Sequence, residues 1–167
     1  MPVPVECRWG RPEDAEQVAA LLARTSTESP FLGEFNLAPP VENFRMLMRP
    51  EEGRLATVVA IAAETGVVGY AHAAQGVPST MRHVAMVAIA VDERYRRQGI
   101  GLRLLRLLAD RSRTLGWVRL RASVWANNDQ SLRLFLRAGY RQDAIIPEQL
   151  RMPDGSLVDE IVLGYRL

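Results

Sequence analysis

The sequence contains no lysine, because all 21 basic residues are arginine, and it contains 19 acidic residues. The formal net charge is therefore only +2. A charge this small does not indicate a nucleic-acid partner, since such binding needs positive charge clustered on one surface. The missing lysine also leaves the protein without a lysine side chain that its own chemistry could modify.

Cysteine is nearly absent as well. Cys7 is the only one, which excludes an intramolecular disulfide and is compatible with a reducing compartment. The longest apolar runs, Leu55–Ala63 and Val84–Val91, are far shorter than the roughly 20 residues that cross a bilayer. The N-terminus has no basic segment followed by an apolar run, so we predict no signal peptide. These absences favour a soluble, cytoplasmic protein with no membrane partner.

The residues that are present suit one globular domain. Hydrophobic residues make up 48% and charged residues 24% of the 167 positions, as is usual for globular proteins. A chain of this length buries about two-thirds of its unfolded surface, so it can form a core without disulfides or metals. Because no repeat, low-complexity tract or linker interrupts it, we predict a single domain over residues 1–167.

Hydrophobic periodicity predicts an α/β protein with a mixed sheet and helices on its faces. A loop rich in Ser, Thr, Pro and Gly is expected at Thr25–Pro40. The order β-α-α-β-β-β-α-β-α-β-β follows from helices that open at Pro12 and that cover Val41–Arg49, Ile100–Leu115 and Ser131–Ala138, and from strands at Val3–Trp9, Leu55–Glu64, Val67–Gln75, His83–Val91, Trp117–Trp125, Tyr140–Leu150 and Ser156–Leu167. The strand His83–Val91 is almost wholly apolar, which predicts burial on both of its faces.

The segment Arg96–Gly101 connects that strand to the start of a strong helix. The first amides of a helix lack internal partners and lie at the positive end of its dipole, so they attract anions. Gly99 and Gly101 would let the backbone approach a ligand closely, and Arg96 and Arg97 would add charge. The glycine spacing fits neither a P-loop nor the Rossmann fingerprint. The segment predicts a pyrophosphate site, and the alternative is a tight strand-to-helix turn without a ligand.

The strand and this loop resemble the acetyl-CoA motif of the GNAT superfamily of N-acetyltransferases, in which Arg or Gln is followed by two residues, Gly, one residue, and Gly or Ala. The second GNAT block is similar to the stretch from Val118–Trp125 through Asn128, Ser131 and Phe135 to Gly139-Tyr140. Three further segments resemble a bacterial subgroup of uncharacterised GNAT enzymes: Thr27–Leu32, Arg82–Val84 and Asp154–Glu160.

The resemblance implies a GNAT fold, with a mostly antiparallel, twisted central sheet, one splayed parallel strand pair, and helices on both faces. It also implies acetyl-CoA as co-substrate and no metal. The backbone of Ile89, Ala90 and Val91 should follow the pantetheine arm, Asn128 and Ser131 should bond the pantetheine chain, and Phe135 should lie near the sulfur. The pyrophosphate should be held by the amides of Arg96, Arg97, Gln98, Gly99, Ile100, Gly101 and Leu102.

Two departures from the family pattern affect proton transfer. Many GNAT enzymes have a tyrosine at the place of Phe135, whose phenol can protonate the leaving thiolate. Many also have a glutamate on the first motif strand, and the best-aligned position here is Ala85. Our candidate base is therefore His83, which shares strand parity with Ala85. The alternative is a histidine without a chemical role, and the same applies more strongly to His72.

Acidic and aromatic residues of the expected loop, namely Glu28, Phe31 and Glu34, are candidates for binding a cationic substrate. We predict an enzyme that moves the acetyl group from acetyl-CoA to a primary amine of a small molecule, by direct transfer in a ternary complex. The alternatives are a protein N-terminal or lysine acetyltransferase and a catalytically silent acyl-CoA-binding module. If the chain forms a homodimer, we expect its C-terminal strands and the segment Phe31–Leu37 to form the interface.

Overall fold

The computed structural model describes residues 4–28, 41–48 and 54–167, without the side chains of residues 26–28, 43, 46 and 47. Its helices are α1 (Ala15–Glu28), α2 (Val41–Leu47), α3 (Ile100–Thr114) and α4 (Asp129–Arg137). Its strands are β1 (Val5–Trp9), β2 (Leu55–Ala62), β3 (Gly66–Gln75), β4 (Val84–Val91), β5 (Arg119–Trp125), β6 (Arg141–Arg151) and β7 (Leu157–Arg166). Short 3-10 turns lie at Pro12–Asp14, Ser79–Met81 and Glu93–Tyr95.

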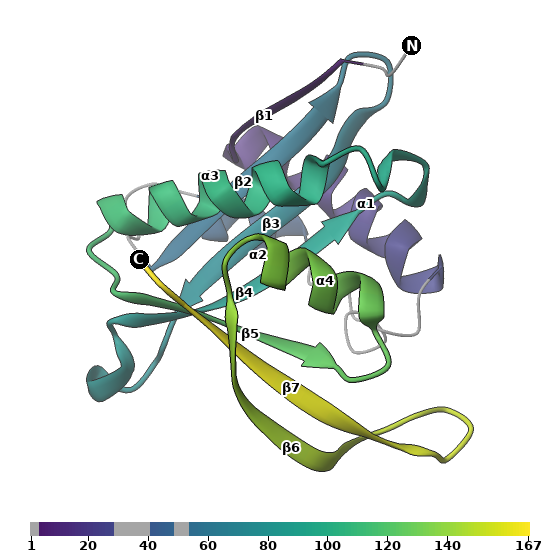
Figure 1. Cartoon of the computed structure of the whole chain (residues 1–167). Helices are drawn as coiled ribbons and strands as arrows, with labels where there is room; N and C mark the ends of the chain where they lie inside the picture. The colour runs from purple at the N-terminus through teal and green to yellow at the C-terminus, as the bar shows by residue number, and fades with distance from the viewer. Residues whose placement is uncertain (1–3, 29–40, 49–53) are drawn as a thin grey trace.

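The strands form one seven-stranded sheet in the order β1-β2-β3-β4-β5-β7-β6. Every neighbouring pair is antiparallel except β4 and β5, which run parallel. In Figure 1, α3 and α4 lie on one face of the sheet and α1 and α2 on the other. The predicted mixed α/β sheet with helices on both faces is therefore confirmed.

The two faces of the sheet carry separate cores. The main core lies beneath α3, where Leu104, Leu105 and Leu108 pack on small and branched residues of the strands. The second core lies beneath α1, where Val18 and Leu21 pack against Tyr70 of β3. The helical spacing of these leucines and valines gives each helix one apolar face, which explains why both helices lie flat on the sheet.

The helix α1 is longer than the sequence predicts. Thr25 was expected to begin a loop, yet the helix continues to Glu28. The Thr25 hydroxyl is buried and donates to the carbonyls of Leu21 and Leu22, at 3.0 and 3.2 Å. This bond satisfies the hydroxyl inside the helix, so the residue does not have to leave the helix to find a partner.

Strand β4 is buried on both faces only at its far end, where Ala90 belongs to the second core, so the prediction of burial on both faces is wrong for the middle of the strand. Ala85 and Val87 are buried, whereas Met86 between them is 38% exposed. The helices α1 and α2 cover mainly β3 and the far end of β4, which leaves the middle of β4 open on their side. An apolar strand therefore faces solvent beside the parallel pair.

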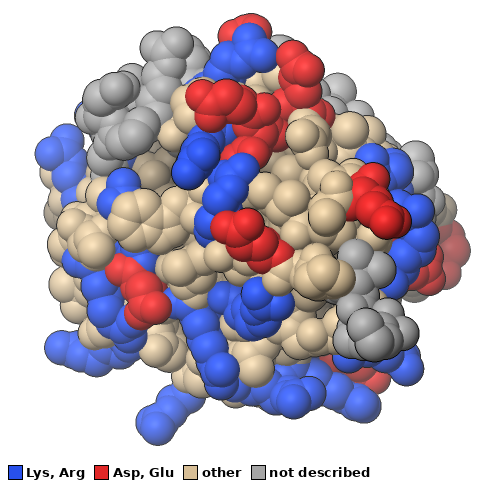
Figure 2. Space-filling model, turned by 90° about the horizontal axis from the view of Figure 1, so that it is seen from above, with Lys and Arg blue, Asp and Glu red and all other residues tan. Residues whose placement is uncertain are grey.

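The arginines of α3 hold the edge strand β1. The guanidinium of Arg103 donates to the Val5 carbonyl at 2.8 Å, and Arg111 lies over the Trp9 ring at 4.6 Å from its centroid. A third arginine, Arg113, pairs with Asp110 at 2.8 Å. On the face shown in Figure 2, acidic residues lie among the arginines. The arginine-rich helix thus uses much of its charge in contacts within the molecule.

Candidate active site

The parallel strands β4 and β5 separate partway along their length. Their ladder joins Val84–Val87 to Arg119–Ala122 and ends there. Beyond this point β4 stays paired with β3 up to Val91, and β5 stays paired with β7 up to Trp125. The backbones of the two strands therefore diverge, as Figure 1 shows between β4 and β5, and we call the V-shaped gap between these backbones the opening.

The direction of the β4 backbone shows which of its groups face this opening. The Asp92 amide donates to the Val68 carbonyl, and the Val84 carbonyl accepts from the Gly76 amide, both at 2.9 Å. Even-numbered residues therefore bond toward β3, and alternation directs the N–H and C=O groups of Ile89 and Val91 toward the opening. Ala90 was expected to join them, but its backbone faces β3 instead.

The loop before α3 has the geometry of an anion site at Gly99. This residue caps α3 in the left-handed region, with φ 77° and ψ 1°. No heavy atom lies within 4 Å of the position that a Cβ would take there, so the space above it is open. Arg97, also left-handed at φ 60°, is exposed two residues earlier. A ligand can therefore reach the first amides of α3, which helix geometry leaves without internal partners.

Gly101 has a different role from the one that the sequence indicated. A Cβ at this position would lie 2.9 Å from Cδ2 of Leu134 on α4. The missing side chain therefore lets α3 and α4 pack closely, rather than admitting a ligand. Ile100 is buried in the main core and Leu102 is half-buried, so their side chains anchor the helix start and only their amides remain for binding.

One side chain fixes the loop to the end of β4, and a second forms a hydrogen bond within the loop. The Nε of Arg96 donates to the Val91 carbonyl at 2.9 Å. The Gln98 amide donates to the Arg94 carbonyl at 3.3 Å. Arg96 thus supports the loop from within, and the exposed Arg97 is better placed to supply charge to a ligand.

Asp92 also organises this loop, and the sequence analysis missed it. Its buried carboxylate accepts from the Arg94 amide at 3.1 Å and from the Arg94 guanidinium at 3.0 and 2.9 Å. The side-chain hydrogen bond from Arg94 keeps the pKa of Asp92 below its ordinary value, against the opposing effect of burial. An aspartate at a strand end, followed two residues later by its partner, is a recognisable turn signal.

The second motif forms the start and core of α4. The Asn128 Oδ1 accepts from the Ser131 amide at 3.1 Å, so Asn128 is the cap of this helix. Its side-chain NH2 makes no hydrogen bond with the described residues and remains able to donate. Phe135 is only 3% exposed and meets Tyr140 edge to face, with ring centroids 4.9 Å apart. The ring therefore belongs to the main core, beneath the helix.

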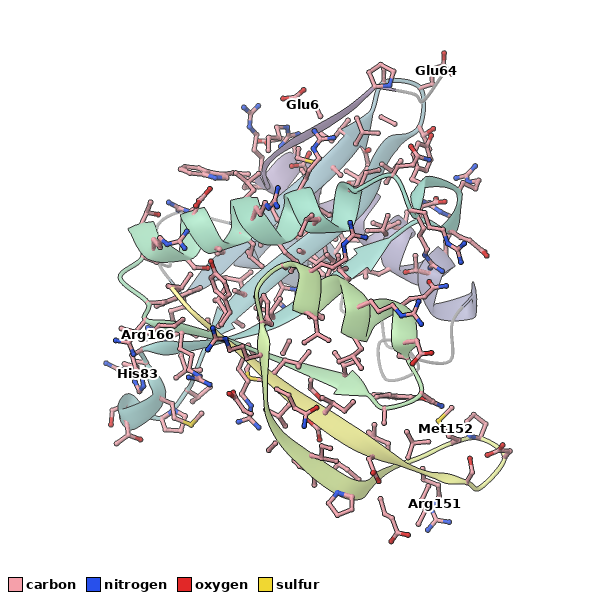
Figure 3. The ribbon with its side chains drawn as sticks, viewed as in Figure 1. Glu6, Glu64, His83, Arg151, Met152 and Arg166 are labelled. Atoms are coloured by element: carbon pink, nitrogen blue, oxygen red, sulfur yellow. The ribbon has the colours of Figure 1, made fainter. Side chains whose placement is uncertain are left out.

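The position of His83 argues against its predicted role as general base. Its carbonyl accepts from the amides of Val118 and Arg119, at 2.9 and 3.1 Å, which places it at the closed end of the parallel pair. It lies roughly 13 Å along the strand from Val87, where the opening begins, at about 3.3 Å per residue. Figure 3 shows it at the same end of the sheet as Arg166, away from the opening. Strand parity predicts the face of the sheet on which the His83 side chain lies, but it does not predict how far along the strand the opening begins.

The second histidine lies closer to the opening. His72 pairs in register with Ala88, the first β4 residue beyond the ladder. The centroids of the His72 and Tyr70 rings lie 5.5 Å apart. The Nδ1 of His72 is buried and makes no hydrogen bond with a described residue. Burial lowers the pKa of His72 to about 4, so the imidazole is neutral at physiological pH.

No acid occupies the middle of β4. Ala85, aligned above with the family's glutamate, is fully buried in the main core, where a carboxylate would be costly. The neighbouring Met86 faces the other side of the sheet. The candidates Phe31 and Glu34 lie outside the described residues, as does the side chain of Glu28. Within the described ranges, no three metal-ligating side chains gather and no helix is long and apolar enough to span a membrane.

Comparison with solved structures identifies the fold. An acetyltransferase of the GNAT family from Streptococcus pneumoniae superposes with a TM-score of 0.84 at 19% identity, covering 98% of this chain and 100% of the other. A GNAT phosphinothricin acetyltransferase from Sinorhizobium meliloti, in complex with acetyl-CoA, gives 0.80 at 19% identity, covering 98% and 88%. Ribosomal-protein-alanine N-acetyltransferase from Brucella melitensis gives 0.79 at 22% identity, covering 97% and 99%.

Sequence comparison adds the family. A search of curated proteins finds no significant match. The model of the acetyltransferase (GNAT) family, however, matches residues 19–140. This range contains the splayed strands, the Gly99 loop and α4. The chain therefore belongs to the GNAT family of acetyltransferases, whose co-substrate is acetyl-CoA.

Proposed function

We propose that the protein transfers the acetyl group of acetyl-CoA to a primary amine of a small molecule, by direct transfer in a ternary complex. One observation carries the proposal: the open Gly99 loop lies at the end of β4 whose unpaired edge forms one wall of the opening. An anion site and a strand edge are thereby continuous, which suits a ligand with a diphosphate at one end and an amide-containing arm at the other.

The residues present fit such a ligand. The amides that begin α3 would hold the diphosphate, with Arg97 supplying charge. The N–H and C=O groups of Ile89 and Val91 would bond the arm as a further strand does, except that the Val91 carbonyl already accepts from Arg96. The NH2 group of Asn128 is a further donor on the other side of the opening.

Acetyl-CoA supplies a thioester, which an amine can attack at the acetyl carbon. At the apex of the opening, where the ladder between β4 and β5 ends, backbone N–H groups would polarise the acetyl carbonyl, as oxyanion donors do. Phe135 has no phenol to protonate the departing sulfur, but a thiol pKa near ~8.5 makes the thiolate an adequate leaving group. Holding both reactants in line would account for much of the rate enhancement.

The test is turnover. The purified protein is incubated with acetyl-CoA and a panel of small primary amines, amino acids and peptides, and free CoA thiol is measured alongside product mass. We expect thiol release that depends on a small amine, and none with Gly99→Asp. Release only with peptides would support protein acetylation instead. Binding of acetyl-CoA without turnover of any amine would indicate a silent binding module and contradict the proposal.

A further inference from the structure

The side chains of β5 divide between the two faces of the sheet. Leu120, Ala122 and Val124 are buried in the main core with the residues of α3 and Phe135. This core closes the α3 side of the sheet at the apex of the opening. Arg121 and Ser123 lie on the opposite face, where Arg121 is half-buried and Ser123 exposed. An acceptor must therefore approach the apex from the Arg121 side.

Arg121 stands at the apex itself. It pairs in register with Met86 of β4 and Gly164 of β7, next to the last rung of the ladder at Val87 and Ala122. Met86 is partly exposed and Gly164 has no side chain. On the β7 side, the ion pair of Arg119 and Asp143 occupies the space that a side chain at Gly164 would fill, and no ion pair among the described residues joins Arg121 to Asp143.

Arg121 is unpaired within the described part of the chain. Its Nε is buried without a hydrogen bond, and none of the ion pairs among the described residues includes it. Arg119, two residues earlier on the same face, is by contrast paired with Asp143. A buried guanidinium donor that is left unpaired is destabilising, and the planar guanidinium fork matches a carboxylate in two parallel hydrogen bonds. A carboxylate on a ligand would therefore supply the partner that no described residue provides.

A carboxylate lies on the other side of Ser123. Glu160 of β7 pairs in register with Trp125 and accepts a hydrogen bond from the Ser123 hydroxyl through one oxygen. Its second oxygen makes no hydrogen bond with a described residue. One face of the opening therefore presents an anion-binding group and a cation-binding group on either side of a small serine.

We propose that the acceptor is an α-amino acid or a close analogue, whose carboxylate binds Arg121 and whose amino group is held by Glu160. This inference rests on the acetyl transfer proposed above. The ammonium gives one proton to Glu160, and the amine nitrogen forms the bond to the acetyl carbon. The carbon–sulfur bond then breaks with its electron pair on sulfur, which takes the second proton of the nitrogen, while Glu160 returns its proton to water.

The experiment compares matched acceptors. The parent protein is first assayed with the twenty standard L-amino acids. The best acceptor is then compared with the amine that lacks only its carboxylate. We expect the amino acid to be preferred in kcat/KM by at least about tenfold, as for the loss of one charge-assisted hydrogen-bonded pair. If the amine without the carboxylate is acetylated equally well or better, the proposal is overturned.

Variants then test the residues. Arg121→Gln should raise KM for the amino acid by about tenfold or more and leave KM for acetyl-CoA and for the carboxylate-free amine unchanged. Arg166→Gln, which removes the same charge from the same face of the sheet at the closed end of the ladder, should change neither KM. Arg121→Lys, which keeps the charge but loses the fork, serves if the glutamine variant does not fold, and should raise the same KM by less. Equal effects of Arg121→Gln on both acceptors would exclude carboxylate binding.

Glu160→Gln should lower kcat and change its pH profile, with KM for acetyl-CoA unchanged. An unaltered kcat and pH profile would remove Glu160 from the acceptor site. The outcomes also separate the two proposals. Thiol release with carboxylate-free amines alone would overturn the amino-acid acceptor but leave acetyl transfer intact. Absence of release with every amine, amino acid and peptide would overturn acetyl transfer itself.

Discussion

Leu134 of α4 packs directly against the α carbon of Gly101 in the first turn of α3, so closely that a Cβ on the glycine would lie 2.9 Å from the leucine. Gly99, two residues earlier, faces open space. The two glycines of the motif therefore serve different purposes. One sets the distance between two helices, and the other leaves room for a ligand.

Substitutions at these glycines should have different effects. Gly99→Asp should abolish acetyl-CoA binding through repulsion of the diphosphate and lower the stability by only about 1 kcal/mol, the cost of a left-handed residue. Gly99→Asn is the uncharged control and should bind more strongly than Gly99→Asp. Gly101→Ala should mainly lower the melting temperature, because α4 must move. Calorimetric titration and thermal unfolding measure the two effects. Unimpaired binding by Gly99→Asp would refute the anion site.

His83→Ala should leave kcat/KM and its pH profile nearly unchanged, because the residue lies at the closed end of the parallel pair. The measurement is steady-state kinetics across a pH series with the acceptor identified in the amine panel. A fall of about a hundredfold, the size expected for a lost general base, would restore His83 to the mechanism.

His72 should make stability depend on pH. Its folded pKa of about 4 lies below the ordinary value of 6.5, so the unfolded state binds the proton more readily. The contribution of the neutral His72 to the free energy of unfolding is fully present above pH 6.5 and is lost as the pH drops toward 4. Between pH 7.5 and pH 5 the loss should be about 2 kcal/mol. Urea unfolding of the parent and of His72→Phe at both pH values measures it, and an equal pH effect in both proteins would contradict the assignment.

Phe135→Ala should lower the free energy of unfolding by about 3–5 kcal/mol, because the ring is buried against Tyr140. Phe135→Tyr keeps the ring and adds a hydroxyl, so it should bind acetyl-CoA normally, and any rise in kcat would reveal a new proton donor. Melting temperatures and kcat against pH for the three proteins give the comparison. Full stability and activity of Phe135→Ala would show that the alignment of the second motif is shifted.

The parts of the fold that depend on local signals were predictable from sequence. The glycine-capped start of α3 is a short-range pattern, and the structure has this helix where the pattern predicts it. Helix α4 begins at Asp129, two residues before the predicted Ser131, because Asn128 caps it. The order of helices and strands followed from periodicity in the same way. The predicted end of α1 was wrong for a reason that is also local, since the Thr25 hydroxyl donates to a carbonyl within the helix.

The remaining features depend on register between distant segments. The ladder ends at Val87 and Ala122, and that single fact decides that Ile89 faces the opening and that His83 does not. Nothing near any of these residues in the sequence encodes where the ladder stops. The contact of Gly101 with Leu134 and the pairing of His72 with Ala88 are likewise properties of the assembled sheet and helices.

The short ladder between β4 and β5 has a mechanical consequence. Strands β1 to β4 are joined along most of their lengths, as are β5 to β7, but only the rungs from Val84 to Val87 connect these two groups. Within the sheet, a ladder of four rungs is thus the only link between the two groups, and the angle between the groups sets the width of the opening. We expect the length of acyl chain that the enzyme accepts to depend on this angle, and substitutions at the rungs to alter acyl preference without any contact with the acyl group.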